Sequence, residues 1–155
     1  MSAKKSSPTS RDQNYASFLK GIRLLGFGML ESHTRQDRAA YVELQDKNRL
    51  TRRISTEYHT MEIEKDFFNA SAKFRLSMED KRGSASPAVV VECTYVAHLH
   101  CVGCQITREL AERFTESELR LVVWPYFRQF VNDATSRMAI RPVVIPFSAA
   151  SEHEG

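Results

Sequence analysis

The chain has 155 residues, of which 42% are hydrophobic and 26% are charged, and its formal net charge is +3. This composition is ordinary for a soluble globular domain with a sizeable core. No apolar run reaches the roughly 20 residues of a membrane-spanning helix, and the N-terminus lacks the apolar stretch of a secretory signal. The sequence therefore predicts a cytoplasmic protein without membrane insertion.

Positive charge is concentrated in the first third of the chain. Residues 1–55 hold 11 Lys and Arg against 5 Asp and Glu, whereas residues 56–155 hold 11 against 14. A basic segment of this kind can bind nucleic acid or an acidic partner, although it is more often a solvated surface. A nucleic-acid-binding accessory protein is therefore an alternative function, and nucleic acid is not the partner that we expect.

The two ends of the chain differ in composition from its centre. Residues 1–14 are rich in Ser and Lys and poor in large apolar side chains, which predicts a disordered basic tail. Residues 15–147 contain the apolar periodicities described below and predict a single domain. Residues 148–155 predict a flexible tail.

Four segments have the pattern of β-strands. Residues 22–31 place three apolar side chains on one side and two glycines on the other, and a short strand follows around residues 61–63. Apolar and polar residues alternate cleanly over residues 72–78, and residues 89–102 form a long β-branched run. A short polar loop over residues 81–87 joins the last two strands, which predicts a hairpin and an antiparallel sheet.

Helical periodicity begins after the last strand. Ile106, Leu110 and Phe114 mark a short helix, and a long amphipathic helix follows it. The residues from Thr115 to Glu118 have the pattern of a capping box. Pro125 then predicts a break, with the long helix starting at the proline.

The order of these elements predicts the fold class. Residues 36–50 are ambiguous and favour a short helix, and the last strands are followed by helices. We therefore predict an α+β fold in which a four-stranded antiparallel β-sheet packs on a long α-helix.

The cysteines are an odd number and do not suggest a disulfide framework. Cys101, Cys104 and His98 are ligand types that zinc accepts, but strand alternation places His98 and Cys101 on opposite faces. A Cys-x-x-Cys pair between strand and helix is also typical of thioredoxin-like redox sites, which need a parallel sheet. We predict no metal and no cofactor, and a zinc or redox protein is a further alternative.

The long helix resembles the signature helix of the SecB family of protein-export chaperones. The matching residues are Trp124, Pro125, Tyr126, Arg128, Ser136 and Arg137 at the family's spacing, then Pro142 one residue later than usual. Pro146 and Phe147 resemble a later family motif in shortened form. The resemblance covers residues 119–147 by motif and residues 20–103 by element order.

The resemblance implies an ATP-independent holdase and no enzymatic activity. Members of the family keep client polypeptides unfolded in apolar grooves between sheet and helices, pass them to the SecA motor, and assemble as dimers of dimers. SecA docks on an acidic sheet surface in that family, so the net charge of +3 argues against this partner. The chain also ends where the family's second C-terminal helix begins, so the predicted fold lacks most of that helix. The expected client is an export substrate, an antitoxin or another aggregation-prone protein.

Two groups of site residues follow from this reading. The predicted client-binding residues are Phe27, Met29, Phe67, Phe68, Phe74 and Trp124. The predicted oligomer interface comprises Tyr126, Phe127, Phe130, Val131, Ala134 and Met138. Ordinary core packing is the alternative for both groups. The chain has no glycine-rich phosphate loop, and no catalytic residues are predicted.

Overall fold

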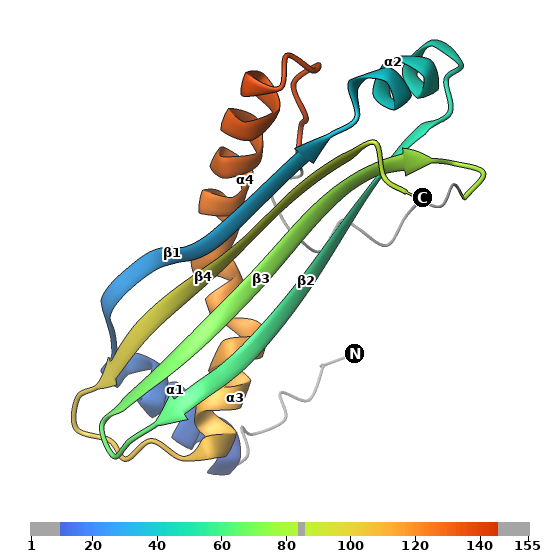
Figure 1. Ribbon diagram of the computed structural model, residues 1–155. Helices are drawn as coiled ribbons and strands as arrows, with labels where there is room; N and C mark the ends of the chain where they lie inside the picture. Colours follow the sequence, from blue (N-terminus) through green and yellow to red (C-terminus); the bar gives the residue numbers. More distant parts are fainter. Residues whose placement is uncertain (1–9, 84–85, 146–155) are drawn as a thin grey trace, which may run out of the picture.

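The computed structural model describes residues 10–83 and 86–145. The elements in chain order are α1 (Ser10–Gly21), β1 (Ile22–Gln36), α2 (Arg38–Asp46), β2 (Leu50–Ile63), β3 (Phe67–Asp80), β4 (Val89–Cys101), α3 (Arg108–Ser117) and α4 (Leu119–Arg137). The α+β prediction is confirmed, because four antiparallel strands form one sheet and the long helix α4 lies across one of its faces (Figure 1). None of the described helices is both long enough and apolar enough to cross a membrane.

The strands lie in the order β1-β4-β3-β2, so the first strand of the chain returns to pair with the last. β1 and β2 are therefore the two edges of the sheet. Both are longer than the sequence pattern indicated, because at an exposed edge polar side chains occupy both faces. In β2, for example, Arg52 and Thr56 lie on the helix-facing side and Arg53 and Ser55 on the other.

The core lies between the inner strands and α4. Apolar side chains on the helix-facing side of β3 and β4 are buried, as the alternation predicted. At its centre the ring of Phe74 stacks on Phe127 of α4, with 4.7 Å between ring centroids, and lies 5.9 Å from Trp124. Packing of a fully buried aromatic pair contributes several kcal/mol, so this contact holds α4 on the sheet.

The break between the last two helices lies at Glu118, so the predicted capping box and helix start were wrong. The Thr115 hydroxyl lies inside α3, where it donates to the Ala111 carbonyl at 2.8 Å and accepts from the Thr60 hydroxyl at 2.9 Å. Pro125 lies inside α4, on its exposed side. The tertiary packing of α4 outweighs the roughly 3 kcal/mol that a proline costs within a helix.

The N-terminal helix was missed by the sequence pattern. Residues 10–14, predicted as part of a disordered tail, belong to α1, and residues 1–9 lie outside the described chain. α1 buries only Tyr15 and Phe18, too few apolar positions to show a helical period. Beyond α4, residues 138–145 contain no helix, and the predicted tail over residues 148–155 also lies outside the description.

Candidate functional site

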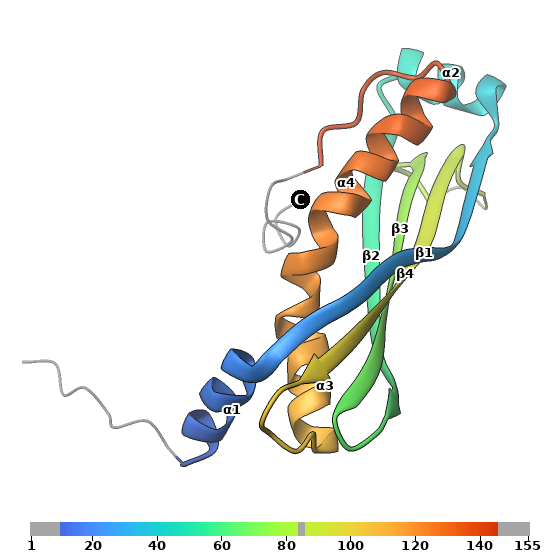
Figure 2. The same cartoon turned by 90° about the vertical axis from the view of Figure 1, so that its left-hand side faces the viewer.

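Exposed apolar side chains gather along β1 and α4. Of the twelve large hydrophobic residues that are exposed in the described chain, seven belong to these two elements. They are Leu24, Leu25, Met29 and Leu30 on β1 and Leu121, Val122 and Tyr126 on α4, and we call them the β1–α4 surface. Figure 2 looks onto this edge, where β1 passes in front of the long helix. A concentration of this kind marks a binding site more often than scattered exposed residues do.

The β1 part of this surface is an edge strand without charge. From Leu24 to Leu30 the strand carries neither a charged side chain nor a proline, the two devices that usually protect an edge. The register to β4 shifts between Leu24 and Gly26 and again between Met29 and Glu31. The extra residues at these bulges are Leu25 and Leu30, whose side chains are 60% and 67% exposed.

An aromatic cluster joins β1 to α4. The ring of Phe27 stacks on Tyr95 of β4 at 5.2 Å and contacts Tyr126 of α4 at 4.6 Å between centroids. Burial raises the pKa of the Tyr95 phenol above its ordinary value. The cluster fixes the distance between strand and helix, so the β1–α4 surface has a rigid centre.

The six predicted client-binding residues do not form one surface. Phe68, Phe74 and Trp124 are buried in the core, and Phe67 lies on the opposite face of the sheet, stacked on His100 at 4.6 Å. Phe27 and Met29 lie at the β1–α4 surface. The leucines of β1 were not predicted as site residues, although their signal, an uncharged strand, was visible in the sequence.

The six predicted interface residues divide in the same way. Phe127, Val131 and Ala134 are buried against the sheet of their own chain. Tyr126 is 49% exposed. Phe130 and Met138 are half-buried beside the core, so they also present part of their surface to solvent.

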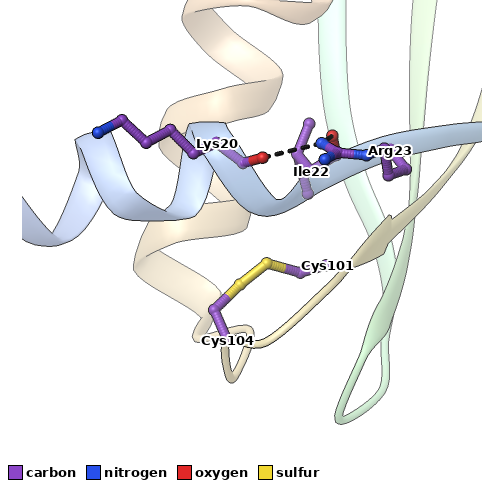
Figure 3. Close-up of a disulfide and its surroundings, with 5 residues drawn as sticks. All are labelled: Lys20, Ile22, Arg23, Cys101 and Cys104. Carbon is purple, nitrogen blue, oxygen red and sulfur yellow. Dashed lines mark hydrogen bonds between the residues drawn. A yellow bond between two sulfur atoms is a disulfide. The ribbon is translucent and has the colours of Figure 1, made fainter.

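The cysteine pair forms a disulfide, which the sequence reading did not expect. Cys101 at the end of β4 is bonded to Cys104, with 5.8 Å between Cα atoms (Figure 3). His98 lies on the other face of the strand, where its Nδ1 is 2.7 Å from Oδ1 of Asn69. No group of three His, Cys, Asp or Glu in the described chain is placed to hold a metal, so nothing in the described residues favours the zinc alternative.

The described basic residues of the N-terminal third belong to several elements of the fold. They are distributed over α1, β1, α2 and β2, and several are neutralised within the chain. Arg11 pairs with Glu109 at 3.1 Å, and Arg49 pairs with Asp80. On the outer sheet face the carboxylate of Glu92 is shared by two cations of β3, so that face is a mixture of charges.

The arrangement of one four-stranded antiparallel sheet on a long helix is the SecB-like fold. No protein-family profile and no curated protein sequence matches the chain. Among solved structures, the SecB-like chaperone Rv1957 of Mycobacterium tuberculosis, in complex with a ChAD peptide from the Rv1956 HigA1 antitoxin, is similar with a TM-score of 0.72. The two are 15% identical over 88% of this chain and 97% of that one. A protein of unknown function from Streptococcus agalactiae has a TM-score of 0.45 at 11% identity, over 81% of this chain and 97% of its own, and this weaker likeness carries no argument. The first likeness establishes the fold.

Proposed function

We propose that the protein is an ATP-independent chaperone that holds unfolded client segments on the β1–α4 surface. The observation that carries the proposal is the uncharged, apolar segment from Leu24 to Leu30 of the edge strand β1, beside exposed apolar side chains of α4. Apolar burial contributes about 25 cal/mol per Å² without directional requirements, so such a surface accepts many sequences. The free edge of β1 can also pair with the backbone of an extended client.

The similar chaperone supports the choice of client. Its structure contains a peptide of an antitoxin, and antitoxins are one of the client classes that the sequence reading predicted. On the outer sheet face of the present chain, Lys73 and Arg75 both pair with the carboxylate of Glu92. This mixture of charges does not favour the docking of SecA, which uses an acidic surface. We therefore infer an aggregation-prone client such as an antitoxin in preference to a substrate passed to SecA.

The test measures, without nucleotide, whether the purified chain binds a second protein that has been chemically unfolded and carboxymethylated, and whether it binds the native form of that second protein. We expect the unfolded form alone to bind. The Leu25→Lys/Leu30→Lys double substitution should weaken this binding roughly tenfold, because two exposed leucines are lost and two positive charges are added. Val42→Lys is the matched control, since Val42 is 45% exposed on α2, away from the surface. Equal binding by both variants would refute the assignment of the surface.

We also propose that copies of the chain associate as a homo-oligomer through the exposed part of α4. Tyr126 and Phe130 have accessible apolar surface on that helix, and Tyr126→Ala or Phe130→Ala should lower the solution mass measured by light scattering. The Leu25→Lys/Leu30→Lys protein distinguishes between client binding and oligomerisation as the role of the two leucines on β1. Lost client binding at an unchanged mass supports the client site, whereas a lower mass shows that β1 is covered by a second copy.

A further inference from the structure

The Cys101–Cys104 disulfide lies close to Gly21, the residue at which α1 meets β1. A Cβ atom on Gly21 would lie 3.1 Å from Sγ of Cys101 and 3.5 Å from Sγ of Cys104. The Val102 amide donates to the Gly21 carbonyl at 3.0 Å. The disulfide therefore lies beneath the connection between α1 and the sheet. The path of the backbone in that connection depends on where the two sulfur atoms lie.

Helix α1 in turn covers one end of the core with two side chains. Phe18 lies 6.3 Å from Phe68 and 6.3 Å from Phe114, between ring centroids, and is almost fully buried. The ring of Tyr15 lies 4.0 Å below the guanidinium of Arg113. The other contacts of α1 with α3 include a hydrogen bond of 3.1 Å between the hydroxyls of Tyr15 and Ser117 and exposed ion pairs, and the ion pairs contribute little. So small an anchor is sensitive to displacement of the connection at its end.

A reactant can reach the disulfide from solvent. A pocket of about 360 Å³ is lined by both cysteines and by Lys65 and His100. Cys101 is buried, whereas Cys104 is half-buried, so Cys104 is the more accessible of the two cysteines. Lys65 and Asp66 place both signs of charge at this pocket, which suits a small peptide thiol that carries both ammonium and carboxylate groups. Cys93 is buried elsewhere, and burial raises the pKa of its thiol to about 12, so it stays protonated.

We propose that Cys101–Cys104 is a reversible exchange site for low-molecular-weight thiols of the glutathione class, and that its reduction releases α1 from the core. The thiolate attacks Sγ of Cys104, the protein disulfide breaks, and Cys101 leaves as a thiolate that takes up a proton. A second thiol molecule attacks the mixed disulfide, which returns Cys104 as a thiol. One protein disulfide is thereby reduced, and two small thiols become one small disulfide.

The link from reduction to α1 is steric. Two thiol sulfurs must move well beyond the roughly 2 Å of a bonded pair. Gly21 has no room for a side chain beside them, and its carbonyl accepts from the Val102 amide between the two cysteines, so a shift of this turn displaces the start of β1 and the end of α1. Phe68 and Phe114 then lose the cover of Phe18.

The test uses the full chain, oxidised and native, in glutathione buffers of graded ratio. Alkylation and mass spectrometry measure the fraction of reduced Cys101 and Cys104, and hydrogen exchange measures the amides of residues 10–21. We expect complete reduction without unfolding, roughly tenfold faster exchange in α1, and recovery on reoxidation. The proposal would be overturned if the disulfide were reduced only after unfolding. It would also be overturned if reduction left hydrogen exchange in α1 unchanged.

Two substitutions separate the chemistry from the steric link. Cys104→Ser should give fast exchange in α1 whatever the glutathione ratio, and the titration of the unaltered chain decides the matter if this variant fails to fold. Gly21→Ala should loosen α1 with the disulfide intact, because its Cβ would lie 2.7 Å from the Val102 carbonyl oxygen. Gly28→Ala in β1 is the matched control, since its Cβ would meet no atom within 4 Å. Unchanged exchange in the Gly21→Ala protein would contradict the steric link.

Discussion

The ring of Phe27 on β1 lies 4.6 Å from the ring of Tyr126 on α4, between centroids. These residues are far apart in the sequence, and each has exposed apolar neighbours, such as Met29 on β1 and Val122 on α4. Their contact brings an edge strand and a long helix together with apolar surface on both. It is the structural basis of the proposed binding surface.

Replacement of Phe27 by Ala should destabilise the protein by about 2 kcal/mol, because the half-buried ring loses its contacts with Tyr95 and Tyr126. Urea unfolding measures this change. Phe67→Ala is the control, since Phe67 is 44% exposed on the other sheet face and should cost less than about 1 kcal/mol. A larger loss for Phe67 than for Phe27 would contradict the importance of the cluster.

Thr115→Val should destabilise the protein by about 1–2 kcal/mol, because the Thr60 hydroxyl loses its acceptor inside the structure. Thermal and urea unfolding give the value. Thr115→Ser keeps the hydroxyl and should lose clearly less stability.

Glu118→Ala should change stability little, because the described structure has no side-chain cap at the start of α4. A large effect at Glu118 instead would favour the capping box.

Pro125→Ala should stabilise the protein by about 1–2 kcal/mol. The substitution supplies the amide that the interior of α4 lacks, and the gain is reduced by the greater freedom of the unfolded chain. Unfolding in urea measures the difference. Gln129→Ala, exposed about one turn further along the same helix, should stay within roughly 0.5 kcal/mol. A loss of stability in the Pro125→Ala protein would show that the proline is needed where it is.

The carboxylate of Asp80 should make the folded protein less stable in acid than at neutral pH. The Arg82 amide donates to its carboxylate at 3.0 Å and the Arg49 guanidinium also pairs with it, which lowers the pKa of Asp80 below its ordinary value. A depressed folded-state pKa adds stability above the unfolded value of about 4, and this stability is lost as the pH falls further. Unfolding midpoints at about pH 7 and about pH 3 test this. Asp80→Asn should reduce the difference between them, and an equal difference in both proteins would rule out the role of Asp80.

The inner part of the fold was predictable from the sequence because its signals are local. Strict alternation in residues 72–78 and the β-branched run over residues 89–102 identified the inner strands β3 and β4, whose helix-facing sides are buried. The edge strand β2 was recognised only near its end, since an edge leaves polar residues on both faces. The helix break predicted at Pro125 was wrong because helix propensity is a local quantity. The packing of Phe127 on Phe74 stabilises α4 as one continuous helix through the proline.

The sequence by itself determined the α+β class, the antiparallel pairing and the long amphipathic helix, because the periods of strand and helix are written in neighbouring residues. Only the tertiary structure decided which apolar residues are exposed. Phe74 and Leu30 both belong to apolar strand segments, yet one is fully buried and the other is 67% exposed. The difference arises because β1 pairs with β4 on one side and remains an edge on the other. Pairing between distant segments, which no local pattern contains, thus placed the candidate surface on β1 and α4 and the disulfide beneath α1.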